Sequence, residues 1–138
     1  MNHRETILAL DPGLRDLGFA VLRDTTLVDF GARTFRFLPR ASRRAAVLTA
    51  IQDWIAHYRP TVFVLEASPG DHRPAFTALR RLEQAIRRLA RAHKLPFAVY
   101  SVQAVRKALV GDGWASKRDT AVVVAGRYPM LRAYLQQK

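Results

Sequence analysis

Two short apolar runs, each ending in a single acidic residue, most constrain how this chain can fold. The first is TILALD at residues 6–11 and the second is TVFVLE at residues 61–66. A continuous apolar run of this length is typical of a central strand that is covered on both faces. A carboxylate at the end of such a strand is costly to bury unless its charge is used. The two runs therefore predict buried strands that end at Asp11 and Glu66.

The segments around these runs alternate between strand and helix patterns. Residues 17–24 and 26–37 are rich in β-branched and aromatic side chains and are separated by a short turn, so they extend the first run into a three-stranded antiparallel meander. Apolar positions at helical spacing predict amphipathic helices over residues 41–58 and 74–93. A strand at 96–102 and helices at 103–109 and 116–126 complete the pattern.

The order of these elements predicts the fold class. A helix between two strands makes the strand at 61–66 parallel to the first strand, because such crossovers join parallel neighbours. We therefore expect a single α/β domain over residues 1–138, with a mixed five-stranded sheet of three antiparallel and two parallel strands flanked by helices. This is a sheet of the ribonuclease-H-like kind.

The composition favours a polyanionic partner. Lys and Arg number 23 against 11 Asp and Glu, giving a formal net charge of +12 in 138 residues, and such an excess invites phosphate contacts. The alternative is a basic surface with no partner. The chain has no cysteine, so any metal must be held by oxygen or histidine. The first apolar run is too short to span a membrane, and we expect a cytoplasmic protein with no membrane contact.

Asp11 and Glu66 together predict a metal site. Ligands bind at the carboxyl ends of the strands in open α/β sheets, and two carboxylates on neighbouring strands repel each other unless a cation lies between them. Magnesium, or manganese in its place, prefers carboxylate oxygen and clamps phosphodiesters. The alternative is that Asp11 begins a turn and Glu66 caps the following helix.

Three stretches resemble one family of nucleases. In order and spacing, ILALDPGLRDLGFAVL, VFVLEAS and VRKALVGDGWASKRD are similar to the RuvC-type Holliday junction resolvases of the ribonuclease-H-like superfamily. The resemblance implies a homodimeric, magnesium-dependent endonuclease that binds four-way DNA junctions and makes paired nicks in recombination and repair. It also implies that Asp11 and Glu66 are metal ligands and that Lys117 helps to hold a phosphate at a helix start.

The sequence departs from this family in its acidic residues. Resolvases of this type use four acidic positions, the last of them near the C-terminus, whereas no carboxylate follows Asp119 here. Three explanations stay open: a shortened chain, a non-catalytic junction-binding protein, and an active enzyme that recruits another acid. Asp71, five residues after Glu66, is the candidate third catalytic acid, although it also suits an N-cap. We expect this chain to bind the ion weakly and to cut poorly or not at all.

Basic side chains supply the expected DNA contacts. The helix at 74–93 places arginines opposite an apolar stripe, which suits either DNA binding or a solvated face. The apolar stripe is the expected dimer interface. The residues predicted to bind nucleic acid are Arg15, Arg80, Arg87, Arg106, Lys107, Lys117 and Arg118.

Overall fold

The computed structural model describes residues 4–13, 15–66, 74–101, 103–104, 107, 111, 123 and 126. The chain divides into two compact units, Met1–Val99 and Tyr100–Lys138. The helices expected at 103–109 and 116–126 lie almost entirely outside the described residues. A single domain over the whole chain stays a prediction.

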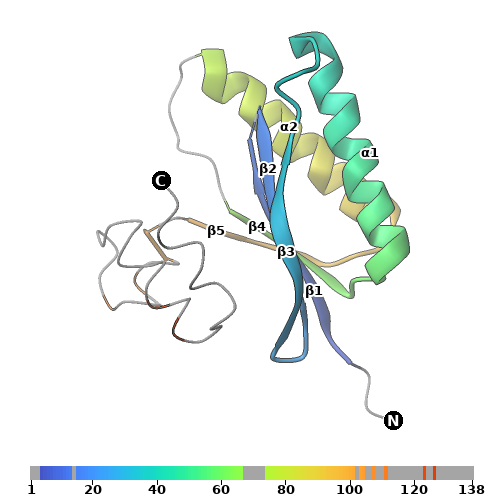
Figure 1. Ribbon diagram of the computed structural model, residues 1–138, viewed down its shortest axis with the longest axis vertical. Helices are drawn as coiled ribbons and strands as arrows, with labels where there is room; N and C mark the ends of the chain where they lie inside the picture. The colour runs from blue at the N-terminus through green and yellow to red at the C-terminus, as the bar shows by residue number, and fades with distance from the viewer. Residues whose placement is uncertain are drawn as a thin grey trace. The chain divides into compact units, whose positions relative to one another are not determined.

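A five-stranded mixed sheet forms the centre of the first unit, as the sequence predicts. Its strand order is β3-β2-β1-β4-β5, in which β1 pairs antiparallel with β2 and parallel with β4. The strand β5 runs the same way as β4 in Figure 1. The strands are β1 (Thr6–Pro12), β2 (Asp16–Arg23), β3 (Thr26–Thr34), β4 (Val62–Glu66) and β5 (Phe97–Tyr100).

Two helices, α1 (Arg40–Tyr58) and α2 (Pro74–Ala92), cover one face of this sheet (Figure 1). Side chains from both helices and from the strands form a single apolar core, whose largest fully buried members are Phe63, Leu8, Leu17, Ile51, Leu65, Ile86, Val21 and Val47. On α1, Trp54 stacks on Phe19 of β2 with ring centroids 4.1 Å apart. The helix layer is therefore held to the sheet by dispersion and apolar burial.

Burial alternates along the two central strands. In β1, Leu8 and Leu10 are buried while Ile7 and Ala9 are half-buried. Both described helices lie on one face of the sheet, so the expectation of strands covered on both faces stays a prediction.

The third strand is shorter than the sequence predicts. The expected strand at 26–37 ends as β3 at Thr34, and the next residue, Phe35, turns into the core with only 3% of its surface exposed. Its backbone N–H donates to the carbonyl oxygen of Arg15 at 2.7 Å. Backbone pairing between the two segments thus extends one residue beyond β3, to a side chain that is buried in the core.

The apolar stripe of α2 faces the protein's own core. Leu82, Ile86 and Ala90 are at most 2% exposed and pack in the core cluster, and Leu79 and Leu89 pack against it. The expectation that this stripe is left exposed as a dimer interface is therefore wrong. Helical periodicity shows that a face is buried, but it does not show what buries it.

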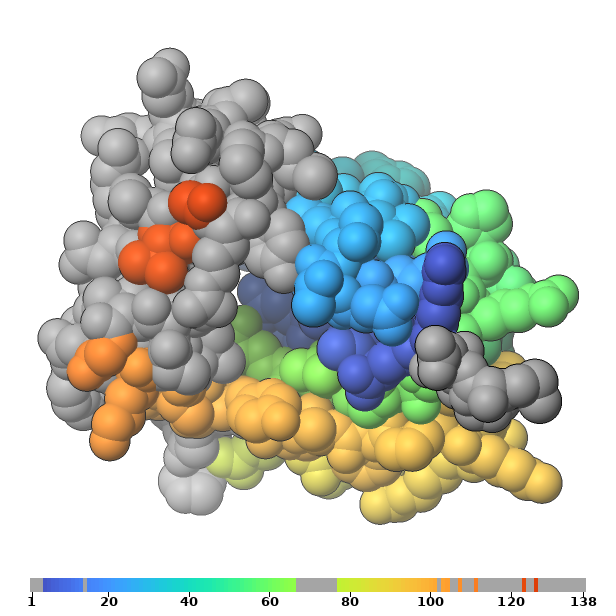
Figure 2. Space-filling view, turned by 90° about the horizontal axis from the view of Figure 1, so that it is seen from below, coloured from blue at the N-terminus to red at the C-terminus, as the bar shows by residue number. Residues whose placement is uncertain are grey.

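The hairpin that joins β2 to β3 lies at the end of the sheet where β1 begins. In Figure 2 this hairpin lies beside the start of β1, with the end of α2 and β5 next to them. The backbone N–H of Asp24 donates to the carbonyl oxygen of Glu5 at 2.8 Å, which fixes the start of β1. The opposite end, where β1 finishes, is the end at which both helices begin.

Gly13 is required by the turn after β1. A Cβ at this position would lie 2.6 Å from the backbone carbonyl oxygen of Asp16, which is too close for any side chain. We predict that Gly13→Ala lowers the free energy of unfolding by ~1–3 kcal/mol, the usual cost of overpacking a rigid site, as measured by urea denaturation. Gly126→Ala, where a Cβ meets nothing within 4 Å, is the control and should be neutral or stabilising. Equal effects of the two substitutions would contradict this role for Gly13.

Candidate active site

The register of the two parallel strands brings Asp11 and Glu66 together. Cα partners run from Ile7 with Val62 to Leu10 with Leu65, so the next residue on each strand is the acid. Neighbouring strands lie roughly 4.8 Å apart. The structure therefore places the two acids side by side at the carboxyl end of the sheet, as the sequence predicts.

Both acids project from the face that α1 and α2 do not cover. Leu10 and Leu65 point into the core under the helices, and alternation along a strand turns the next side chain to the other face. Asp11 is exposed and Glu66 is half-buried. The pair is thus accessible from solvent while its backbone is fixed in the middle of the sheet.

A glycine opposite Asp11 leaves space for its carboxylate. Gly18 is the antiparallel partner of Asp11, and a Cβ there would lie 3.4 Å from the Asp11 Cβ and 3.9 Å from its Oδ2 atom. A larger side chain at this position would crowd the carboxylate. The glycine leaves the β2 side of the Asp11 carboxylate free of a side chain.

The pair fits one hydrated divalent cation. Two carboxylates from adjacent strands provide oxygen ligands, which suit magnesium, an ion that usually keeps several waters. Within the part of the chain that the structure describes, no group of three or more acidic or histidine side chains could hold a metal. Asp71, the predicted third acid, lies outside the described residues.

An ion pair fixes the turn that follows the site. Arg36 donates to Asp16 Oδ2 through its Nη2 atom at 2.6 Å and through Nε at 3.2 Å. The hydrogen bond from Arg36, supported by one from Thr34, lowers the pKa of Asp16. Arg43 in turn donates to the backbone carbonyl of Arg36. The turn between β1 and β2 is therefore tied to the start of α1.

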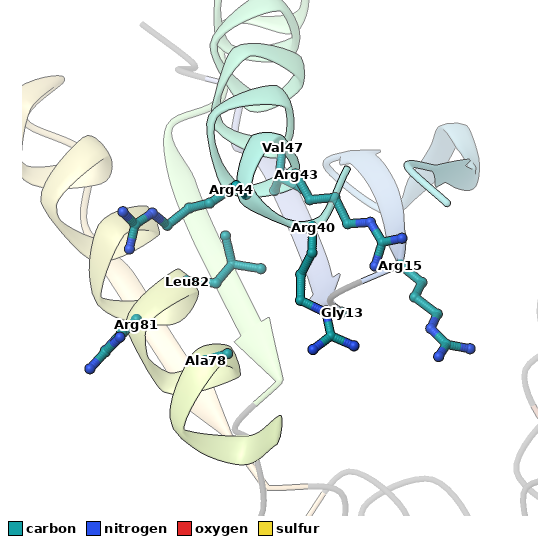
Figure 3. A pocket seen from close by; sticks show the side chains of 10 residues that line it. Gly13, Arg15, Arg40, Arg43, Arg44, Val47, Ala78, Arg81 and Leu82 are labelled. Carbon is teal, nitrogen blue, oxygen red and sulfur yellow. The ribbon is translucent and has the colours of Figure 1, made fainter. Parts of the chain in front are cut away.

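A cavity lined by arginines opens at the same end of the sheet. It has a volume of about 650 Å³ and lies among the turn after β1, the first turns of α1 and the second turn of α2. Its charged lining consists of Arg15, Arg40, Arg43, Arg44 and Arg81. In Figure 3, Arg40 extends toward Gly13 and Arg44 extends to the α2 side above Leu82. The cavity is strongly basic, and none of the described residues that line it is acidic.

The predicted nucleic-acid contacts fall in different places. Arg15 is exposed and lines the cavity, and Lys107 is exposed. Arg80 is half-buried on α2. The Arg87 guanidinium lies over the ring of Phe97, 5.6 Å from its centroid, so part of its binding capacity is used inside the protein. The other three, Arg106, Lys117 and Arg118, lie outside the described residues.

Sequence patterns did not point to the arginines that α1 and α2 contribute to the cavity. Arg40, Arg43 and Arg44 belong to the segment RASRR at the start of α1. A signal was present, because basic side chains in the first turn of a helix oppose the helix dipole, which favours acids there. Arg81 lies in the second turn of α2, and no sequence pattern pointed to it.

The fold and the acid pair define an α/β protein of the ribonuclease-H-like class, with two carboxylates on adjacent parallel strands. A family model described as "Crossover junction endodeoxyribonuclease RuvC" matches residues 7–132. The chain belongs to this RuvC family of endonucleases.

Similar proteins support this assignment. The RuvC of Oleidesulfovibrio alaskensis is 33% identical over 129 residues, which cover 87% of this chain and 75% of the relative. A RuvC of Neisseria meningitidis is 32% identical over 124 residues, covering 86% of this chain and 70% of the relative. Family membership thus confirms the resemblance that three sequence stretches indicate.

Two solved structures share the fold. RuvC of Thermus thermophilus in complex with a Holliday junction substrate superposes with a TM-score of 0.76 at 20% identity, covering 89% of this chain and 79% of that one. The yeast mitochondrial Holliday junction resolvase Ydc2 gives a TM-score of 0.63 at 13% identity, covering 89% and 62%. These matches confirm the ribonuclease-H-like sheet.

The Asp16–Arg36 pair should make stability depend on pH. Because the pKa of Asp16 is lowered in the folded protein, its contribution is present above the unfolded pKa of about 3.9 and is lost as the pH falls through the folded value. We predict that Asp16→Asn lowers the urea midpoint at pH 7 and that its deficit against the wild type shrinks below about pH 4.

Asp53→Asn, on the exposed surface of α1, is the control and should show no such pH-dependent deficit. An Asp16→Asn deficit that stays constant from pH 7 to pH 3 would contradict the assigned role.

Proposed function

We propose that this chain is a metal-dependent endonuclease that cuts four-way DNA junctions in recombination and repair. The observation that carries the proposal is the adjacent pair Asp11 and Glu66 on the open face of the sheet, in register at the ends of β1 and β4. Membership of the RuvC family supports it. The similar Thermus thermophilus protein is itself described in complex with a Holliday junction substrate.

Asp11 and Glu66 are the proposed metal ligands. When bound, magnesium would polarise the scissile phosphate and activate a water for in-line attack. The role of this chain's residues is to hold two negative oxygens at a fixed spacing on rigid strands and to leave one side open to the DNA backbone. Gly18 opposite Asp11 contributes by keeping that side free of a side chain.

The charge of the chain supports DNA as the partner. A formal net charge of +12 attracts the phosphate backbone, and each phosphate contact releases counterions, so affinity falls steeply with salt.

A junction cut symmetrically calls for two sites related by a two-fold axis, and we infer a homodimer. We also propose that the protein acts in the cytoplasm, because DNA is its proposed substrate. No helix among the described residues is long and apolar enough to cross a membrane.

The alternative is a junction-binding protein without cleavage. Family membership and the acid pair favour the nuclease, because two carboxylates on one sheet edge repel DNA unless a cation neutralises them.

A nicking assay on a synthetic four-way junction with magnesium tests the proposal. Asp11→Asn and Glu66→Gln each remove a charged metal ligand, which is worth several kcal/mol of transition-state stabilisation. We therefore predict that each lowers the nicking rate by roughly a hundredfold or more. Asp53→Asn, whose carboxylate is exposed on α1, is the matched control and should cut like the wild type.

The same experiment also measures junction binding and tests Asp71 as a third metal ligand. Junction binding in calcium should survive Asp11→Asn, since removing one carboxylate does not remove phosphate contacts. Cleavage that is indifferent to Asp11 and Glu66 would sink the site assignment, and junction binding without any cutting would favour the non-catalytic alternative. Loss of cutting in Asp71→Asn would add Asp71 to the ligand set.

A further inference from the structure

The arginine-lined cavity brings five positively charged side chains together. Arg40 and Arg44 lie in the first two turns of α1 and are exposed at its positive end. No acidic residue is present in the first turn of α1, and its N-cap, Pro39, makes no side-chain hydrogen bond to the helix. Cations at this end of a helix oppose the dipole. The two arginines therefore do not stabilise α1 through its dipole, whereas an anion bound at this end would be stabilised by it.

Few of these charges are neutralised within the protein. Arg43 is held by the backbone carbonyl oxygens of Leu38 and Arg36, at 3.1 and 3.3 Å, so its role is partly structural. For Arg40, Arg44 and Arg81, no described carboxylate forms an ion pair. Their donors are therefore available to a ligand.

The size and lining of the cavity fit a nucleotide better than a lone phosphate. About 650 Å³ is within the range of ordinary small-molecule sites. The apolar part of the lining consists of Ala41, Val47, Ala78 and Leu82. Arginine grips phosphate with two parallel donors, while small aliphatic side chains present a surface for a sugar or a base. The cavity thus combines an anion-binding rim with an apolar wall.

We infer that this cavity binds one nucleotide unit, with its phosphate on Arg40, Arg44 and Arg81, and that the nucleotide belongs to the DNA strand bound by the protein. Gly13 lines the cavity and is two residues from Asp11. The cavity and the acid pair therefore lie at the same end of β1, on opposite faces of the sheet. The DNA part of the inference rests on the proposed function, whereas the phosphate site itself does not.

The first test measures phosphate binding without DNA. The probes are sodium phosphate and deoxyadenosine monophosphate against chloride at equal ionic strength, read as the thermal unfolding midpoint, because a ligand that binds the folded state raises that midpoint. We expect both probes to stabilise the wild type and to lose this effect in the double variant Arg40→Gln/Arg44→Gln. The control, Arg33→Gln/Arg59→Gln, removes two exposed arginines outside the cavity and should keep it.

The second test measures the salt dependence of four-way junction binding. Losing one phosphate contact lowers the slope of log affinity against log salt by about 0.9. The cavity variant should bind the junction roughly tenfold more weakly, with a slope reduced by about one, whereas the control should keep the wild-type slope.

The outcomes separate the two claims. If phosphate stabilises both double variants as it stabilises the wild type, or stabilises none of the three proteins, the cavity is not a phosphate site. If the effect is lost only in the cavity variant but its junction affinity and slope match the control, the site takes a free nucleotide and the DNA part is overturned. If no protein binds junction DNA while the cavity variant alone loses phosphate stabilisation, the proposed function fails and the phosphate site stands.

Discussion

The parallel pairing of β1 with β4 is the constraint on which the rest of this structure depends. Its register, with Leu10 beside Leu65, sets two things at once. The leucines turn into the core under α1 and α2, and the acids that follow them turn to the open face. A slip of β4 by one residue would turn Leu65 to the open face and Glu66 toward the core. The apolar core therefore enforces the position of the acid pair.

The turn after β1 connects this pair to the helix layer. Gly13 permits the close approach of the Asp16 carbonyl, and Asp16 binds Arg36, whose backbone carbonyl accepts from Arg43. A short chain of contacts thus links the turn at the end of β1 to the start of α1. Rigid support of this kind holds site geometry better than a free loop would.

Charge is divided between the two faces of the sheet. The acids face one side, and the cavity with its five arginines opens on the side where α1 and α2 begin. Under the proposed function, the acids gather cations where phosphate is cut and the arginines bind phosphate where the strand is held. Separating the two charges by the thickness of the sheet keeps the arginines from competing with the metal for the carboxylates.

The sequence by itself determined the strands and helices between residues 6 and 100, the antiparallel meander, the parallel crossover and the acid pair. Apolar runs, turn residues and helical spacing are local signals, and the crossover rule gives the parallel direction. Only the tertiary structure decided that the apolar stripe of α2 is covered by the protein's own sheet, and that β3 ends at Thr34, just before the buried Phe35. It alone also shows that Arg81 lines the same cavity as Arg40 and Arg44, although about forty residues of chain separate them. The physical reason is that periodicity shows which face is buried, whereas contacts between distant segments depend on how the helices pack.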